Sequence, residues 1–406
     1  MRGFAITSCY NNKRNMKVII FYTLVICFLF SCSSRTKRQQ TSLMSGMDTR
    51  DSFYNFNLQN IDKYVNIDTG VLNSIAQKIN FIHLQSSRNS NLTDLNLILD
   101  RVGNKFIASS LRSCVMQFDS AGNYEKKLVD IGRAKNEVQN RLYQWTFQNN
   151  QVTLCQGNKM ITYNPLSGKT KGYLSKQYYY NAILLRDGNY VALPNLGPEM
   201  KDNRYLDFLD TGYEIVKSVS YTSSRDVYYW VPNSYTGRLD TYGLYPSYMG
   251  DVLFKDLFND TIYKIKDVNT IIPYICLVRG NSAPTVENVT DESNNKRLIY
   301  IKNVTESENY VFVSYGFQES MFSVVFEKET GIPLILTEME FKNATSIINS
   351  RYFIDYVTPV GKRIKVGVVN VARDRLYCVV RTGDALDFMP QMSEYDNPLI
   401  LEVILK

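Results

Sequence analysis

The chain has 406 residues, 13% of them aromatic, and a formal net charge of +7 at pH 7. Its single histidine, His83, excludes any site with two or more histidine ligands and leaves one candidate base for a Ser-His-Asp or Cys-His arrangement. Because His83 lies in the alternating run INFIHLQ, we interpret it as a structural strand residue.

The N-terminus has the pattern of a secretory signal. Basic residues precede the apolar run VIIFYTLVICFLF, residues 18–30, which is shorter than the roughly 20 residues that a spanning helix needs. The tetrad LFSC, residues 29–32, matches a bacterial lipobox, so we predict cleavage before Cys32 and lipid attachment to its thiol. An uncleaved membrane anchor is the alternative. Met16 would begin a more ordinary signal than Met1 does.

Three parts are predicted along the chain: a lipoprotein signal peptide at 1–31, a flexible polar tether at 32–52, and a folded domain at 53–406. Loss of the signal peptide removes four basic residues and no acidic ones, which leaves 42 basic against 39 acidic residues. A net charge of +3 on a chain of this size gives no general attraction to nucleic acid, so we predict no nucleic-acid partner.

Short strands separated by polar turns dominate the folded domain. A hairpin of two apolar strands around a tight turn recurs six times, with turns near Gly103, Asn149, Gly188, Gly250, Glu308 and Ser350. A second hairpin follows the first in five of these repeats, as in CVMQFDSAGNYEKKL and MFSVVFEKETGIPLIL. Two hairpins per repeat and six repeats predict an all-β fold, a six-bladed β-propeller of four-stranded antiparallel blades. Two stacked β-sandwich domains are the alternative.

The two ends of the domain are predicted to close the ring together. The run Asn397–Lys406 is apolar enough to be a buried strand. We expect it to join blade six beside an N-terminal strand drawn from Tyr64–Ile67 or Ile79–Leu84. The stretch Asp384–Asp396 before it is predicted to form a short helix or turn.

The four cysteines of the domain are predicted to be small buried hydrophobes. Each lies in an apolar, strand-like context, and more than 40 residues separate successive ones: Cys114, Cys155, Cys276 and Cys378. A disulfide framework or a zinc site would need closer grouping or partner histidines. We therefore predict no metal site and no cofactor.

Several segments resemble a known family. The lipobox, FDSAGNYEKKLVDIGRAKNEV at 118–138, FNDTIYKI at 258–265 and YDNPLILEVILK at 395–406 resemble the six-bladed β-propeller lipoproteins of gut-dwelling Gram-negative bacteria. The chain has RAKNE at 133–137, where that family usually has a Gly-Pro-Gly-Glu turn. Surface-exported lipoproteins of such bacteria often carry acidic residues directly after the lipidated cysteine, and none is present here. The resemblance therefore implies a propeller anchored to the outer membrane and facing the periplasm, with no activity common to the family.

Long connections are predicted on one face of the propeller. In an antiparallel blade the first-to-second and third-to-fourth strand turns lie on one face, and the remaining connections lie on the other, which we call the loop face. Four insertions are assigned to the loop face: 193–204, 225–248, 279–297 and 358–375. Loops on a rigid scaffold commonly carry function.

The second of these insertions, RDVYYWVPNSYTGRLDTYGLYPSY, has six tyrosines and one of the two tryptophans. Rings on a loop offer a large contact area at low entropy cost. We therefore predict a ligand-binding surface formed by Tyr228, Tyr229, Trp230, Arg238, Tyr242 and Tyr245. Alternatively, the rings pack on one another and on the blade ends and close the fold over the channel.

Three classes of function remain open from the sequence. The favoured one is a lipid-anchored envelope module that uses its loop face to engage a glycan, a peptide or a partner protein. The alternative is a carboxylate-based hydrolase or lyase with its site at the channel mouth. A structural component without a small ligand is the third. The paired carboxylates Asp291-Glu292 and Glu306/Glu308 are interpreted as solvated surface rather than as acid–base or Ca²⁺ sites, and no catalytic residue is assigned.

Overall fold

A computed structural model describes most of the chain after residue 52. The described residues are 53–59, 61, 70–88, 90–92, 97–110, 114–130, 132–134, 136–137, 144–156, 158–194, 204–220, 232–233, 237–238, 242–285, 288–289, 297–340 and 352–406. They fall within one compact unit, Ser52–Lys406. The helices among them are short: α2 (Leu72–Ile75), the 3-10 helix η2 (Gly280–Ser282) and α5 (Thr382–Ala385). None of the described helices has the length and apolar character needed to cross a membrane.

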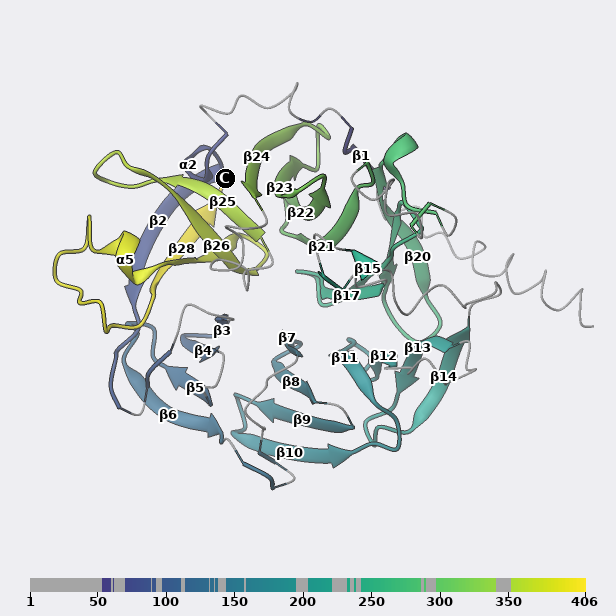
Figure 1. Cartoon of the computed structure of the whole chain (residues 1–406). Coiled ribbons are helices and arrows are strands. Elements are labelled where there is room, and N and C mark those ends of the chain that lie inside the picture. The colour runs from purple at the N-terminus through teal and green to yellow at the C-terminus, as the bar shows by residue number, and fades with distance from the viewer. Residues whose placement is uncertain are drawn as a thin grey trace, which may run out of the picture. The chain divides into compact units, whose positions relative to one another are not determined.

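Six sheets form the blades of a ring, which confirms the predicted all-β six-bladed propeller (Figure 1). Blades one to three are β3 (Ile98–Val102), β4 (Lys105–Ser109), β5 (Val115–Phe118) and β6 (Tyr124–Val129); β7 (Gln144–Gln148), β8 (Gln151–Gln156), β9 (Lys159–Asn164) and β10 (Lys169–Leu174); and β11 (Tyr179–Leu184), β12 (Tyr190–Pro194), β13 (Arg204–Leu209) and β14 (Ile215–Ser220).

The other three blades follow the same order along the chain. They are β17 (Tyr242–Pro246), β18 (Val252–Asp256), β19 (Thr261–Ile265) and β20 (Ile271–Val278); β21 (Tyr300–Glu306), β22 (Tyr310–Phe317), β23 (Ser320–Glu327) and β24 (Pro333–Glu340); and β25 (Tyr352–Val357), β26 (Arg363–Val371), β27 (Arg375–Val380) and β28 (Leu399–Leu405). A separate two-stranded hairpin, β15 (Pro232–Asn233) and β16 (Gly237–Arg238), lies in the connection between blades three and four.

Ten of the eleven predicted hairpins form at the predicted turns. The backbone explains the turn residues. Gly103, Gly188 and Gly250 have φ values of +60°, +88° and +82°, which glycine adopts without a steric cost. Asn149 and Asn150 both have positive φ, as a two-residue turn of type I′ requires.

Blade six differs from the prediction. β25 pairs with the strand that follows it, β26, through the turn at residues 358–362, where Gly361 has a φ of +80°. The predicted turn near Ser350 lies outside the described residues. The prediction that residues 358–375 form an insertion is wrong, because nine of them form β26 and alternate residues of this strand, such as Ile364 and Val366, are buried.

The predicted ring closure is confirmed. β2 (Ala76–His83) pairs antiparallel with β28, with Phe81 opposite Leu401, and β28 also pairs with β27. Of the two candidate N-terminal strands, Ile79–Leu84 is therefore correct in its position, and Tyr64–Ile67 lies outside the described residues. The helix predicted near the C-terminus corresponds to α5, which begins two residues earlier than expected.

A second N-terminal strand joins blade four, which the sequence did not predict. β1 (Tyr54–Asn57) pairs parallel to β20 as a fifth strand, with Tyr54 opposite Ile275. Phe56 is buried and stacks on Phe326 of blade five, with 4.7 Å between the ring centroids. The chain before blade one is thus attached to the ring at two blades.

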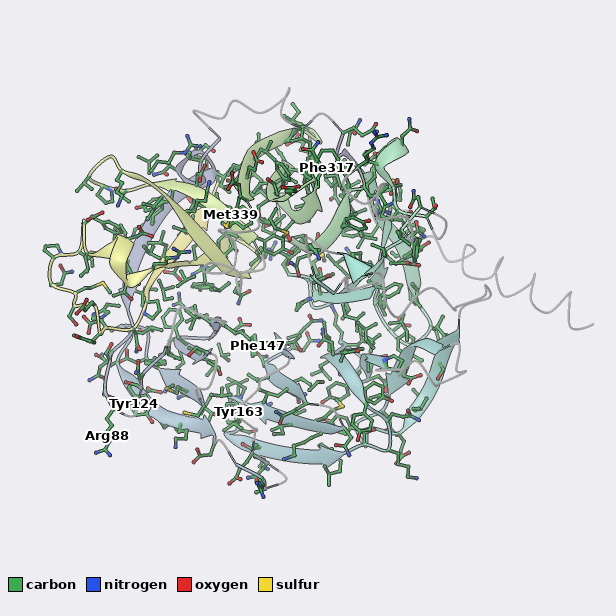
Figure 2. The ribbon with its side chains drawn as sticks, viewed as in Figure 1. Arg88, Tyr124, Phe147, Tyr163, Phe317 and Met339 are labelled. Carbon is green, nitrogen blue, oxygen red and sulfur yellow. The ribbon has the colours of Figure 1, made fainter. Side chains whose placement is uncertain are left out.

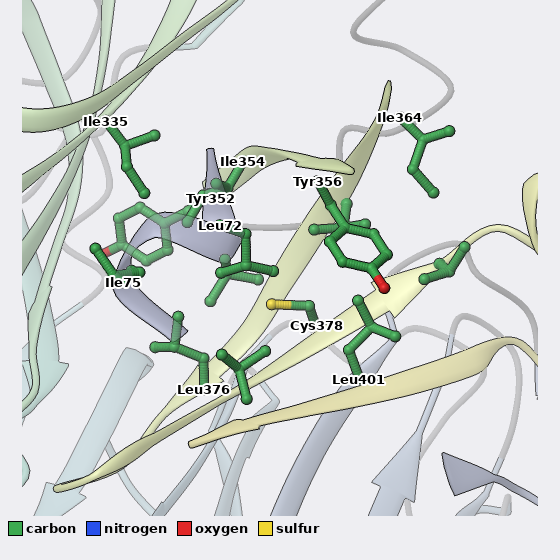
Figure 3. Packing of buried hydrophobic residues seen from close by; sticks show 14 of the residues in the cluster. Leu72, Ile75, Ile335, Tyr352, Ile354, Tyr356, Ile364, Leu376, Cys378 and Leu401 are labelled. Carbon is green, nitrogen blue, oxygen red and sulfur yellow. The ribbon is translucent and has the colours of Figure 1, made fainter. Parts of the chain in front are cut away.

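The core lies between neighbouring blades, and the largest cluster packs blade five against blade six (Figure 3). Cys378 is buried in this cluster among aliphatic side chains, and Cys155 is buried between blades two and three. All four cysteines of the described part are free, but the prediction that each is buried holds only for Cys155 and Cys378, because Cys114 and Cys276 are partly exposed. Burial raises the pKa of the Cys155 thiol to about 12, so it behaves as a small apolar residue.

Candidate functional site

Exposed tyrosine rings lie at the start of β11, the innermost strand of blade three. Tyr178 and Tyr180 are 51% and 37% exposed, whereas Tyr179 between them is 2% exposed and donates its hydroxyl to Asp207. Side chains alternate between the two sides of a strand, so the buried Tyr179 places its two neighbours on the opposite side. Tyr178 and Tyr180 therefore present their rings to the surface.

These rings lie at the end of blade three where two long connections begin or end. Tyr179 is paired with Pro194, the last residue of β12, so the connection 195–203 starts beside it. Asn181 Nδ2 donates to the carbonyl oxygen of Leu244 at 3.2 Å, which places β11 next to β17. The aromatic connection between blades three and four ends at β17. This end of blade three, with Tyr178 and Tyr180, is the candidate functional site.

Most of the ring residues predicted from the sequence lie outside the described part. This applies to Tyr228, Tyr229 and Trp230. Arg238 lies on β16 and Tyr242 on β17, where only the backbone is described.

The structure corrects the prediction for Tyr245. Its side chain is 6% exposed and packs in the core between blades four and five. Its hydroxyl donates to the carbonyl oxygen of Lys302 at 2.6 Å. A ring that is both buried and hydrogen-bonded has no surface to offer a ligand. The sequence interpretation extended the loop too far, because residues 242–246 form the innermost strand of blade four.

The opposite end of the blades contains a buried charge pair. Glu306 is fully buried at the end of β21 and accepts hydrogen bonds from Ser247 Oγ at 2.6 Å and from the Tyr274 hydroxyl at 2.8 Å. Lys328 Nζ donates to the same carboxylate and, at 2.8 Å, to the carbonyl oxygen of Ser307. The prediction of solvated surface is therefore wrong for Glu306.

Both members of the pair belong to blade five, and hydrogen bonds from Ser247 and Tyr274 to Glu306 connect it to blade four. Burial lowers the pKa of Lys328, and burial together with the Glu306 carboxylate raises the pKa of Tyr274, so its hydroxyl stays a donor. The Lys328 ammonium also lies 4.7 Å from the Tyr248 ring centroid. Both oxygens of Glu306 are occupied by protein donors, which suits a structural role better than proton transfer to a substrate.

Two further carboxylates are paired with basic side chains of the protein. Glu402 accepts from Arg375 at 3.0 Å and also contacts Arg101. Glu308 is exposed, as predicted, and forms a bidentate pair with Arg373. The residues Asp291-Glu292 lie outside the described part. Among the described residues, no group of three or more His, Cys, Asp or Glu side chains could hold a metal ion.

A comparison with protein-family models identifies the domain. The family described as "Domain of unknown function (DUF4934)" matches residues 53–403, which is most of the chain. The chain belongs to this family. No curated protein matches this DUF4934 chain significantly.

One solved structure supports the fold of the DUF4934 domain, and a second is similar to it more weakly. A Bacteroides fragilis protein described as exported has 15% identity and a TM-score of 0.62, covering 87% of this chain and 100% of its own. A virginiamycin B lyase of Staphylococcus aureus has 10% identity and a TM-score of 0.40, covering 81% of this chain and 99% of its own. At such identities only the fold is informative. The propeller implied by the sequence resemblance is thus confirmed, and lipid attachment stays a prediction.

Proposed function

We propose that this DUF4934 protein is a lipid-anchored binding protein of the cell envelope, whose loop face engages a glycan, a peptide or a partner protein. The observation that carries the proposal is the pair of exposed rings, Tyr178 and Tyr180, at the start of the innermost strand of blade three. Tyrosine combines an apolar ring with a polar tip, so it stacks on sugars and peptides at low entropy cost. The ring-rich segment 225–241, before β17, belongs to the same surface in this proposal.

The state of the carboxylates supports binding over the hydrolase or lyase alternative. General acid–base catalysis needs a carboxyl group within hydrogen-bond reach of a substrate. In the described part, Glu306, Glu402 and Asp251 each contact a cationic side chain of the protein. These carboxylates already bind basic groups of the protein itself, which suits a structural role better than catalysis.

The proposed location follows from the leader. The lipobox at 29–32 favours lipid attachment at Cys32, and a structural relative is described as exported. We place the protein on the outer membrane, facing the periplasm, because no acidic residues follow Cys32 directly.

The double replacement Tyr178→Ala/Tyr180→Ala is expected to weaken capture of the ligand by about 1–3 kcal/mol, the range of a modest aromatic hot spot. The ligand is first found with the wild-type protein on a glycan array and by pull-down from envelope extracts. Because both rings are exposed, the melting temperature should change little. Trp230→Ala is expected to weaken the same interaction.

Tyr395→Ala is the matched control, since Tyr395 is 82% exposed and lies before the last strand of blade six. It should leave capture unchanged. An equal loss of ligand capture in Tyr395→Ala would contradict the proposed surface. So would a large fall in the melting temperature of the double variant together with unchanged capture.

Cys32→Ala is expected to move the protein from the membrane fraction to the soluble fraction, because it removes the residue that accepts the lipid. Fractionation of cells that express either form, with immunodetection, provides the measurement. A variant that stays uncleaved in the membrane fraction would instead support the membrane-anchor alternative.

A further inference from the structure

Blade two has no acidic residue. Between residues 138 and 186 the chain contains no Asp or Glu, although the overall frequency, 39 in 406 residues, would place about five in such a stretch. The same stretch has six basic residues: Arg141, Lys159, Lys169, Lys171, Lys176 and Arg186. Its charge is therefore strongly positive within a domain whose overall charge is nearly balanced.

Three of these lysines lie along the outer edge of the blade. Lys169 and Lys171 are exposed on β10, and Lys176 is exposed directly after it. Among the described residues, none of the three forms an ion pair. Lysines on other blades do, as in the pairs of Lys105 with Glu125 and Lys362 with Asp387.

Two exposed leucines flank the lysines. Leu166, in the turn before β10, is 73% exposed, and Leu174, the last residue of β10, is 62% exposed. β10 runs along the rim of the ring, and none of the described strands pairs with its outer edge, in contrast to β20 and β28 (Figure 1). We call Leu166, Lys169, Lys171, Leu174 and Lys176 the basic rim.

We propose that the basic rim docks on an anionic lipid surface. Lysine ammonium groups are attracted to anionic headgroups. Exposed leucine side chains bind favourably at the boundary between headgroups and acyl chains, because their apolar surface is removed from water there. Lysines on an outer strand also prevent edge-to-edge pairing of sheets, but that role explains neither the exposed leucines nor the missing acidic residues. A soluble anionic polymer would use the lysines and leave the leucines in water. Most of the basic rim lies on the outer strand of blade two, whereas Tyr178 and Tyr180 lie at the inner strand of blade three. Only Lys176 is in the connection that also holds Tyr178, so vesicle binding and ligand capture are measured separately.

The test uses residues 52–406, because all described strands, the ring closure and the core lie within them. The protein is sedimented with vesicles of phosphatidylcholine, with or without phosphatidylglycerol. We expect binding only when phosphatidylglycerol is present. The variant Lys169→Glu/Lys171→Glu/Lys176→Glu should bind these vesicles roughly 100-fold more weakly, because each basic residue near an anionic surface strengthens binding about fivefold. Leu166→Ser/Leu174→Ser should bind roughly tenfold more weakly.

The control variant Lys78→Glu/Arg88→Glu/Arg297→Glu makes the same change in net charge away from blade two. All three residues are exposed, and Figure 2 shows Arg88 projecting outward from the ring. At physiological salt, charges beyond about 8 Å are largely screened, so binding should change little. Thermal melts check that each variant is folded.

The proposal is overturned if the wild type binds neither vesicle, if it binds both equally, or if the control loses as much binding as the lysine variant. It is also overturned if the leucine variant binds as well as the wild type and dextran sulfate displaces both. In that last case the partner is an anionic polymer.

Discussion

Deletion of Leu399–Lys406 is expected to abolish cooperative unfolding of the whole propeller. β28 is an interior strand of blade six, paired with β27 on one side and with β2 on the other. Leu399, Leu401 and Val403 are fully buried in the largest core cluster. Without β28, β2 has no partner strand in the described part and the ring opens. Circular dichroism and calorimetry during heating would show loss of the single sharp transition.

Removal of Lys406 alone is the control for this deletion. Lys406 is exposed and follows the last strand, so its loss should leave the transition cooperative. A chain that lacks residues 399–406 but melts like the full-length protein would show that the ring does not depend on this closure.

Local patterns predicted most of the strands because each hairpin is specified by neighbouring residues. The sequence RDGNY, for example, gives a turn at Gly188 whose positive φ only glycine adopts easily, and the flanking strands are apolar and almost entirely buried. Long-range pairing had no such signal. β1 has only four residues, YNFN, and its partner β20 begins more than 200 residues later. A parallel strand of this kind cannot be read from the sequence around it.

The error in blade six came from the sequence between residues 358 and 375. The first hairpin of blade six was placed at a turn near Ser350, so this segment was assigned to the next connection, although Ile364, Val366 and Val368 alternate as in a strand with one buried side. The same period of two would have separated Tyr179, which is buried, from its exposed neighbours Tyr178 and Tyr180.

The burial of Glu306 could not be predicted from its surroundings in the sequence. It lies in the polar stretch NVTESEN, which is typical of a surface turn. Its three partners come from elsewhere in the sequence. Ser247 and Tyr274 belong to blade four, and Lys328 lies in the turn between β23 and β24 of blade five. Only the packing of the two blades brings these groups together.

Lys328→Met is expected to lower the free energy of unfolding by about 3–5 kcal/mol, because it leaves the carboxylate of Glu306 buried without its cation. The side chains of Lys328 and Glu306 are 5% and 0% exposed, so water cannot solvate the Glu306 carboxylate after the ammonium group is removed. Urea denaturation of the domain gives the change in free energy. Lys362→Met is the matched control: it removes a lysine from an exposed ion pair with Asp387 and should have little effect.

The double variant Glu306→Gln/Lys328→Met distinguishes the energetic cost of an unpaired buried carboxylate from the cost of lost packing. The glutamine carbonyl can still accept from one of the hydroxyls of Ser247 and Tyr274, its amide group can donate to the hydroxyl oxygen of the other, and no ion is left in the core. The double variant should therefore be more stable than Lys328→Met alone, by an amount that measures the cost of the unpaired carboxylate. If the second replacement lowers stability further, the effect of Lys328→Met comes from lost contacts of its methylene chain, and the charge of Glu306 is not the reason that Lys328 is needed at this site.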